Sequence, residues 1–299
     1  MKTIGLAGCG NWGKNILRDL IQLDCKVYVA DIKADMRHRA LEMGAAKAFC
    51  SIESLLVCDG YIVAVPIPDL TPVCAKLLKY MKPIFSEKTL CRSMDDYELL
   101  KSLGGSGLIF AMHKWHYHGG IEALRRIAAS GKIGVLKQIH TIRHGWVDDF
   151  HGGDVFWTQA VHDLTIIKHI LGYIPQKVEC MDVIQNMDGQ PVSFIAKIGN
   201  KPSVLLSVSG RHCSKQSGVS ILGSAGTAEL HNAYDDHITI RTESGEENIP
   251  IDTSLPLYLE LKEFAQYLQG GPKPRCGLGE AWEATQAILQ LRKAAMPGN

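Results

Sequence analysis

Three glycines with fixed spacing and one acid further along the chain are the residues of this sequence whose arrangement could bind a ligand. The glycines stand in Gly8-Cys9-Gly10-Asn11-Trp12-Gly13, and the acid is Asp31. In such a pattern the first glycine makes a tight turn, the second lets the backbone approach a pyrophosphate, and the third lets a helix pack close to a strand. The acid accepts hydrogen bonds from ribose hydroxyls. We therefore expect a dinucleotide to bind here, with Gly8, Gly10, Asn11, Trp12, Gly13 and Asp31 as binding residues.

The elements around these residues decide what the glycines mean, because glycine triplets also occur in ordinary loops. An apolar run over 3–7 precedes them, apolar residues on one helical face follow over 16–23, and a second apolar run over 26–30 ends at Asp31. These patterns predict strand, helix and strand, the order that a Rossmann unit requires. The alternative is a glycine-rich turn in some other α/β protein.

The charges near Asp31 bear on the choice of cofactor. A carboxylate at this position repels a 2′-phosphate, which favours NAD. Lys33, Arg37 and Arg39 follow closely and keep NADP open as the alternative.

Composition limits the kinds of partner. The 299 residues leave room for two domains, and 46% hydrophobic content is typical of a globular protein. Lys plus Arg number 32 and Asp plus Glu 31, a net charge of +1, so no overall field favours nucleic acid or a membrane. We expect no leader peptide and no membrane-spanning stretch. The nine cysteines contain no C-x-x-C pair and indicate reduced thiols in the cytoplasm.

The next binding residues are predicted at the ends of two further strands. Pro66-Ile67-Pro68 must end the apolar strand over 61–65, because two prolines one residue apart cannot continue a ladder. Ligands of parallel sheets bind at this carboxyl edge, so Pro66 is a predicted cofactor residue. A strand over 83–86 then leads into Glu87-Lys88-Thr89-Leu90.

The glycine pattern, the Val-Pro turn and Glu87-Lys88-Thr89-Leu90 together resemble the Gfo/Idh/MocA family of oxidoreductases, whose second signature is E-K-P-[LIM]. Thr89 stands where the family has proline. The resemblance implies that Lys88 reaches both nicotinamide ribose and substrate as a catalytic residue, with Glu87 beside the cofactor. The alternative for Lys88 is a solvated surface lysine.

A histidine-rich segment, His113-Lys114-Trp115-His116-Tyr117-His118, marks the passage into a second domain. The resemblance places a substrate-contacting loop here, with Lys114 and His116 as substrate-binding residues. Three histidines within six residues also suggest a metal site, but no acid or thiol lies close in sequence and we expect no metal.

The segment over 152–163 resembles the third motif of the family, a glycine-led helix with an inward histidine. This resemblance makes His162 the catalytic acid/base, with Trp157 and Thr158 as substrate-binding residues; the alternative for His162 is a core histidine. Many relatives have aspartate where this chain has Thr158. Asp163 and Asp154 do not replace that carboxylate if the segment is a regular helix.

We therefore expect an α/β protein with an NAD(P)-binding Rossmann domain over 1–115 and, over 116–299, a substrate-binding and oligomerisation domain with a large, open, mostly antiparallel sheet. The resemblance implies a dehydrogenase or reductase that transfers hydride between NAD, or NADP, and a secondary alcohol or ketone of a sugar, sugar nucleotide or polyol. It also implies a homodimer or homotetramer assembled through the second sheet. The alternatives are a redox-neutral NAD-dependent lyase or glycosidase, and a non-catalytic ligand sensor of the same fold.

Overall fold

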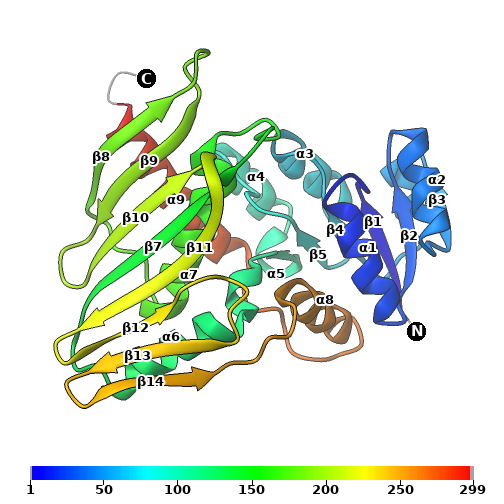
Figure 1. Cartoon of the computed structure of the whole chain (residues 1–299). Helices are drawn as coiled ribbons and strands as arrows, with labels where there is room; N and C mark the ends of the chain where they lie inside the picture. The colour runs from blue at the N-terminus through cyan, green and yellow to red at the C-terminus, as the bar shows by residue number, and fades with distance from the viewer. Residues whose placement is uncertain (1, 297–299) are drawn as a thin grey trace. The chain divides into compact units, whose positions relative to one another are not determined.

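The computed structural model describes residues 2–296, which form two compact units. The first contains the chain up to Lys114 together with 255–282, and the second begins at Trp115, runs to Ser254 and resumes at Glu283. Figure 1 colours the chain from blue at the N-terminus to red at the C-terminus. Each unit has its own sheet.

The sheet of the first unit has six parallel strands in the order β3-β2-β1-β4-β5-β6. This is the strand order of a doubly wound dinucleotide-binding fold. Continuous apolar runs form its central strands because helices cover both faces of such a sheet. The strands are β1 (Thr3–Ala7), β2 (Lys26–Ala30), β3 (Lys47–Phe49), β4 (Gly60–Val63), β5 (Ile84–Ser86) and β6 (Ile109–Ala111).

The helices of the first unit follow the strands in alternation, and one more comes from far along the chain. They are α1 (Gly13–Gln22), α2 (Ala34–Glu42), α3 (Ile67–Leu78), α4 (Met94–Ser102), α5 (Gly105–Leu108) and α8 (Pro256–Tyr267), with a 3-10 turn η1 (Ile52–Leu55). Figure 1 shows α8 beside α1, and α8 brings Leu257, Leu261 and Phe264 into the same core as β1 and α1. The rings of Phe264 and Phe85 stack at 5.1 Å. Residues 255–282 therefore belong to the first unit. The expected division into 1–115 and 116–299 places this segment in the second domain instead.

The second unit has an eight-stranded sheet in the order β14-β13-β12-β11-β7-β10-β9-β8. Its pairs are antiparallel except β7 with β10, which is parallel. The strands are β7 (Leu136–Trp146), β8 (Val178–Gln185), β9 (Pro191–Ile198), β10 (Ser203–Ser209), β11 (Arg211–Gly223), β12 (Gly226–Leu230), β13 (His237–Thr242) and β14 (Gly245–Pro250). The predicted fold class is confirmed.

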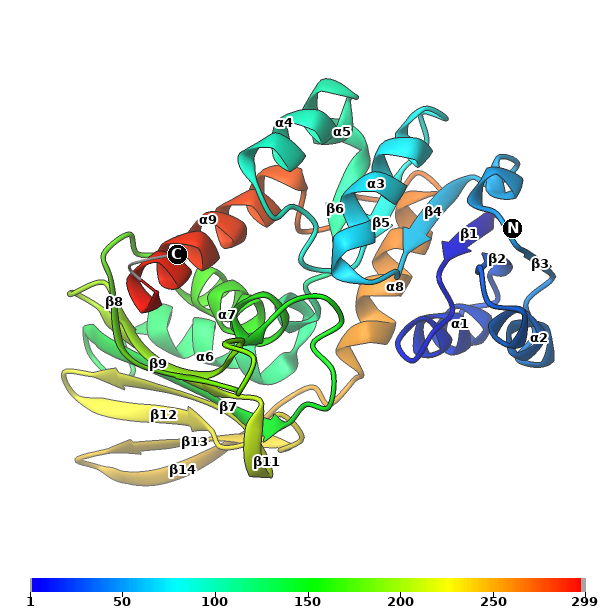
Figure 2. The same ribbon diagram turned by 90° about the horizontal axis from the view of Figure 1, so that it is seen from above.

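Helices cover one face of this second sheet, as Figure 2 shows. α6 (Gly119–Ser130) packs on β11, β12 and β13, and α7 (Val161–Leu171) packs on β7. α9 (Leu278–Ala295) is divided between the two units. Side chains of β7 alternate between buried positions on the helix side, such as Ile139 and Arg143, and half-buried positions on the open side, such as His140 and His144.

Three local structures leave little trace in the apolar pattern of the sequence. β14 is an edge strand and has no apolar alternation. β11 begins at Arg211, well before its apolar residues over 219–222. The short helix α5 follows Gly104, which lies in the left-handed region (φ +85°).

Within residues 2–296, the helices include none that is long and apolar enough to cross a membrane.

Candidate functional site

The glycine loop joins β1 to α1, and its geometry fits a dinucleotide phosphate. Gly8 has φ of +89°, and a Cβ there would lie 2.4 Å from the carbonyl oxygen of Ala64. A Cβ on Gly13 would lie 2.3 Å from the carbonyl oxygen of Gly8, so strand and helix approach too closely for any side chain. At Gly10, by contrast, no described heavy atom lies within 4 Å of an added Cβ. The backbone at Gly10, just ahead of α1, is therefore open to a pyrophosphate.

Asp31 is held beside this loop by backbone hydrogen bonds. Its Oδ2 accepts from the Cys9 N–H at 2.7 Å and its Oδ1 from the Lys33 N–H at 2.9 Å. Each carboxylate oxygen keeps acceptor capacity for a ribose hydroxyl. Arg37 donates from Nη1 to the carbonyl oxygens of Asp31 (2.8 Å) and Ile32 (2.9 Å). Burial, and then the charge of Asp31, raise the pKa of the Cys9 thiol to about 11, so Cys9 stays a protonated packing group.

Glu87 and Lys88 follow β5, at the carboxyl edge of the same sheet. Glu87 accepts a hydrogen bond from the indole Nε1 of Trp12, and the Lys88 N–H donates to Glu87 Oε2 at 3.2 Å. The Nζ of Lys114 lies 5.1 Å from the Trp12 ring centroid, within the range of a cation–π contact. Burial raises the pKa of Glu87, and the charges of Lys88 and Lys114 and the Trp12 hydrogen bond oppose that shift. The Lys88–Thr89 peptide bond is cis.

The remaining cofactor residues of the sequence analysis also lie at this edge. Pro66 stands between β4 and α3, immediately before the first residue of α3. Asn11 is exposed in the glycine loop. The first unit therefore collects every predicted cofactor residue on the carboxyl side of one parallel sheet.

Sequence reasoning missed Glu260, a buried acid on α8. Its side chain is 1% exposed, and its Oε2 has no hydrogen-bond partner among the described residues. Burial first, and then the charge of Glu87, raise the pKa of Glu260 well above its usual range, with Lys114 opposing and Glu263 adding to the shift. Burial of Glu260 near the charges of Glu87 and Lys114 therefore favours its un-ionised form.

In the second unit, His162 lies on the first turn of α7 beside Trp115. The two ring centroids are 6.5 Å apart, with the planes at 66°. The guanidinium of Arg143, from β7, lies 4.7 Å from the Trp115 centroid. Arg143 also forms a two-pronged ion pair with Asp163, with Nε–Oδ2 at 2.8 Å and Nη2–Oδ1 at 3.2 Å. Asp163 is thus committed to Arg143.

Asp154 is likewise engaged, at the start of the segment that leads to His162. Its Oδ1 accepts from the N–H groups of Phe156 (2.9 Å) and Trp157 (3.2 Å), and its carboxylate pairs with Arg292 of α9. The Arg292 guanidinium lies 5.6 Å from the Trp157 ring centroid. Trp157 is therefore buried against an ion pair, and Asp154 caps the turn that carries it.

The turn η3 (Phe156–Ala160) is π-helical, whereas the sequence predicted a regular α-helix through this segment. Thr158 Oγ1 donates to the carbonyl oxygen of Asp154 at 2.8 Å. A π turn adds a residue to the helical repeat, so α-helical spacing does not place Thr158 on the face of His162. Such turns are frequent at functional sites, and the apolar pattern of the sequence does not reveal them.

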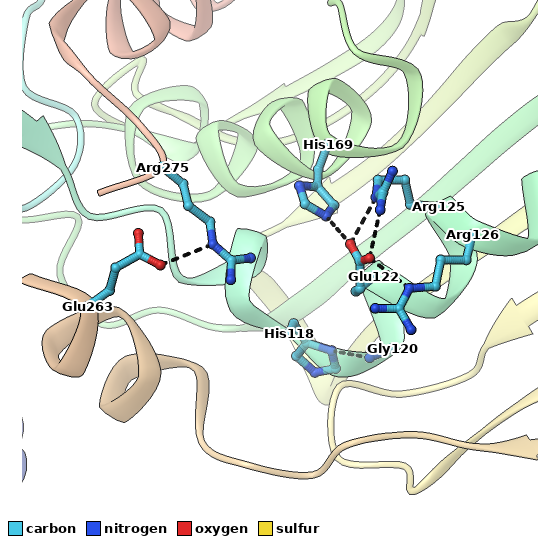
Figure 3. A network of polar contacts seen from close by, with 8 residues as sticks. All are labelled: His118, Gly120, Glu122, Arg125, Arg126, His169, Glu263 and Arg275. Atoms are coloured by element: carbon cyan, nitrogen blue, oxygen red, sulfur yellow. Dashed lines mark hydrogen bonds and ion pairs between the residues drawn. The ribbon is translucent and has the colours of Figure 1, made fainter. Parts of the chain in front are cut away.

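His116 lies in a 3-10 turn, η2 (Lys114–Tyr117), and is buried. Its ring centroid is 5.1 Å from that of His169, on α7. His169 Nε2 is 3.0 Å from Oε2 of Glu122, on α6 (Figure 3). Neither Glu122 nor His169 was expected from the sequence, because partners on two different helices leave no local pattern.

The predicted site residues thus fall into two groups, each within one unit. Trp12, Glu87, Lys88 and Lys114 lie together in the first unit, beside the glycine loop. His162 lies with Trp115 in the second unit, near Arg143 and Asp163. Among the described residues, no group of three or more His, Cys, Asp or Glu side chains is arranged to hold a metal ion.

Solved structures show which class of fold these units define. An oxidoreductase from Agrobacterium radiobacter in complex with NAD+, L-tartaric acid and magnesium matches with a TM-score of 0.87 at 13% identity, over 100% of this chain and 97% of that one. A UDP-N-acetylglucosamine 3-dehydrogenase from Acidithiobacillus ferrooxidans matches with a TM-score of 0.87 at 16% identity, over 99% and 98%. The myo-inositol 2-dehydrogenase from Lactobacillus plantarum matches at 0.84 and 15%, over 100% and 98%. At these identities the matches show that the chain shares its fold with solved oxidoreductases and dehydrogenases.

Sequence comparison finds more limited similarity. The chain is 26% identical to 2,7-anhydro-N-acetylneuraminate hydratase of Escherichia coli K12 over 196 residues, which are 60% of this chain and 52% of the relative. It is 23% identical to an uncharacterized oxidoreductase of Streptococcus pneumoniae serotype 4 over 194 residues, with the same coverage. The match therefore spans about half the length of these curated relatives. No protein-family model matches the sequence.

Proposed function

We propose that this protein is an NAD-dependent oxidoreductase that transfers hydride between the nicotinamide and a secondary alcohol or ketone of a sugar, sugar nucleotide or polyol. The observation that carries the proposal is the group of Trp12, Glu87, Lys88 and Lys114 beside an open glycine loop, at the carboxyl edge of a complete Rossmann sheet. A bound nicotinamide supplies the hydride acceptor or donor. The chain supplies binding, orientation and proton transfer.

The residue roles follow from the chemistry of the side chains. The backbone at Gly10 would receive the pyrophosphate, and Asp31 the ribose hydroxyls. Lys88, as an ammonium, would stabilise negative charge that develops on the substrate oxygen. His162 would exchange the hydroxyl proton as general acid/base. Lys114, His116, Trp157 and Thr158 remain the proposed substrate-binding residues.

NAD is the proposed cofactor, with NADP as the alternative. The fixed carboxylate of Asp31 supports NAD, because a 2′-phosphate would meet a like charge at the end of β2. Nη1 of Arg37 donates to two carbonyl oxygens, and the remaining N–H groups of its guanidinium keep NADP open as the alternative. Fluorescence titration of the native protein with NADH and NADPH tests this choice. Tighter binding of NADPH would make the role of Asp31 wrong.

The substrate class is inferred from similar proteins. Dehydrogenases of UDP-N-acetylglucosamine and of myo-inositol share this fold, and these names support a sugar-type alcohol. A screen of sugars, sugar nucleotides and polyols, read as NADH absorbance, tests the proposal. Substrate-dependent formation or loss of NADH is expected. Replacement of Lys88 or His162 by alanine should then lower kcat about a hundredfold or more while nucleotide binding survives.

A redox-neutral reaction is the second candidate, because a relative at 26% identity is named a hydratase. Such an enzyme would convert a sugar derivative without net change in NADH. Product analysis by NMR at constant NADH absorbance would identify it. Nucleotide binding without any conversion would instead indicate a ligand sensor.

The proposed location is the cytoplasm. The exposed Cys50 and Cys213 are free thiols, which is typical of proteins in a reducing compartment.

A further inference from the structure

Asp154 binds three of the four residues that follow it, at the start of the turn that leads to the acid/base. Its Oδ1 accepts from the N–H groups of Phe156 (2.9 Å) and Trp157 (3.2 Å). Its carbonyl oxygen accepts from the N–H of Thr158 (3.0 Å) and from the Thr158 hydroxyl (2.8 Å). Its Oδ2 pairs with Arg292 of α9. The buried Asp154 therefore joins the first turn of η3 to a charge on another helix.

Arg292 contacts the same turn a second time, through its aromatic rings. The guanidinium lies 5.6 Å from the ring centroid of Trp157 and 6.0 Å from that of Phe156, within the range of cation–π contacts. The Phe156 ring stacks in turn on Phe194 of β9, with the centroids 4.5 Å apart. Trp157 and Phe156 are 4% and 0% exposed, so water screens these contacts little. One side chain of α9 thus contacts both the cap and the rings of η3.

The π form of η3 changes which residue lies one turn before His162. A π turn pairs residue i with i+5, whereas an α-helix pairs i with i+4. Across η3, position 157 is therefore one turn before 162, and in a regular α-helix position 158 would be. Isolated π turns are rare because the α-helix is the favoured form. The contacts at the start of η3 therefore decide whether its extra residue is kept.

We propose that Asp154 and Arg292 are positioning residues that hold η3 in its π register. This register keeps Trp157, and not Thr158, one turn before the acid/base His162. The proposal rests on the oxidoreductase function and on the role of His162 proposed above. Asp154 and Arg292 act through the turn and take no part in proton or hydride transfer. Loss of the pair lets η3 relax towards the α-helix, which rotates Trp157 by about 100° relative to His162.

Arg292→Met and Asp154→Asn test the pair in the full-length protein. Methionine keeps an apolar stem beside the rings and removes the charge, and asparagine keeps the Oδ1 acceptor and removes the charge. We expect kcat to fall at least about tenfold in both variants, because misplacement near the reacting groups is costly. The dissociation constant of NADH should stay within twofold of the native value. Arg292→Lys restores the charge and should bring kcat to within about threefold of native.

Glu283→Gln is the matched control. Glu283 pairs with Lys168, so this ion pair also joins α9 to α7, but it lies away from the Asp154 cap. Its loss should leave kcat within about twofold of native, as expected for a largely exposed pair. An equal fall of kcat in Glu283→Gln and Arg292→Met would show that only the attachment of α9 matters, which overturns the proposal.

Deletion of the half-buried Gln159 tests the register itself. Removing one residue from η3 converts the π turn into an α turn and places Trp157 four residues before the histidine, again one turn away. The deletion should therefore restore kcat at least about fivefold in the Arg292→Met background, where a merely structural role of Arg292 predicts a further loss. A double variant that folds and binds NADH without any rescue overturns the register.

Amide hydrogen exchange over residues 155–162 needs neither turnover nor the deletion. Exchange should be at least about tenfold faster in Arg292→Met than in the native protein, and native-like in Glu283→Gln. Native-like exchange or native-like kcat in Arg292→Met overturns the positioning role and leaves the oxidoreductase function standing. A native protein that converts no substrate overturns that function, and the catalytic meaning of the register with it.

Discussion

Glu260 shows how one buried acid couples stability to pH. Its pKa in the folded protein is raised well above its usual range, by burial first and then by Glu87. In the unfolded chain the pKa of a glutamate is about 4.3. The folded state therefore binds the extra proton, and native stability falls as pH rises from that value towards the raised one.

Glu260→Gln removes this titration and keeps the shape of the neutral acid. The free energy of unfolding of the variant should increase relative to that of the native protein by about 1 kcal/mol or more between pH 5 and pH 8. Urea unfolding at the two pH values measures the change. Glu243→Gln, at an exposed position, is the control and should show no such trend. A difference between Glu260→Gln and the native protein that is the same at both pH values would contradict the raised pKa of Glu260.

Asp31 carries the cofactor prediction at the same scale. Asp31→Ser removes the carboxylate that two backbone N–H groups hold, so repulsion of a 2′-phosphate disappears together with ribose hydrogen bonds. The ratio of NADPH to NADH dissociation constants should shift towards NADPH by about tenfold, on the scale of one lost charge interaction. Fluorescence titration of both nucleotides gives the ratio. An unchanged ratio would mean that Asp31 does not face the ribose.

The residues found from sequence and those missed differ in one physical respect. Gly8, Gly10, Gly13 and Asp31 act through the local turn and the strand ends beside them, so spacing along the chain reveals them. Glu260 meets Glu87 and Lys114 only because the chain returns to the first unit after residue 254. Contacts of this kind depend on packing between distant segments and leave no periodic signal.

At the scale of elements, the buried ion pair of Arg143 with Asp163 ties β7 to α7. The side chains are 9% and 0% exposed, and the pair is two-pronged. Removing one partner leaves a charge in the interior without its counter-charge, which is far more costly than losing a surface pair. The pair therefore holds the helix of His162 on its sheet.

Asp163→Ala should accordingly lower the free energy of unfolding by about 3–5 kcal/mol. Glu98→Ala is the matched control, since its pair with Lys101 is half exposed on α4 and should contribute at most about 1 kcal/mol. Chemical denaturation of both variants measures the contrast. If both variants lost the same small amount of unfolding free energy, another group would have to stabilise the charge of Arg143 in the absence of Asp163.

Elements were predictable where their pattern is carried by apolar side chains. The runs that became β1, β2 and β4 are continuous because both faces are buried, and the Pro66-Ile67-Pro68 segment ends β4 as expected. The sequence did not predict the edge strand β14 or the π turn η3, for two different reasons. β14 forms by pairing with β13 without burying apolar residues, and η3 is set by the Asp154 cap within a segment that reads as regular helix.

At the scale of the molecule, the second sheet has one face covered by helices and one open. Ile195 and Leu222 are each 43% exposed on the open face, and Ile142 and Leu205 lie half-buried between them in β7 and β10. Lys197 of β9 lies opposite Leu205 on the same face. Burial, and then the neighbouring His212 and His140, lower the pKa of His144, whose ring stacks on His212 at 4.7 Å.

The exposed apolar side chains of this open sheet face suit burial against a second copy, and we propose that the protein self-associates through it as a dimer or tetramer. Ile195→Lys combined with Leu205→Lys places two charges on this face and should shift the native oligomer to smaller species, because an interface buries charges only at high cost. Light scattering after size exclusion measures the mass. Leu99→Lys, on α4 with similar exposure (46%), should leave the mass unchanged. A native protein that is monomeric at micromolar concentration, or a double variant of unchanged mass, would show that the open face is not the interface.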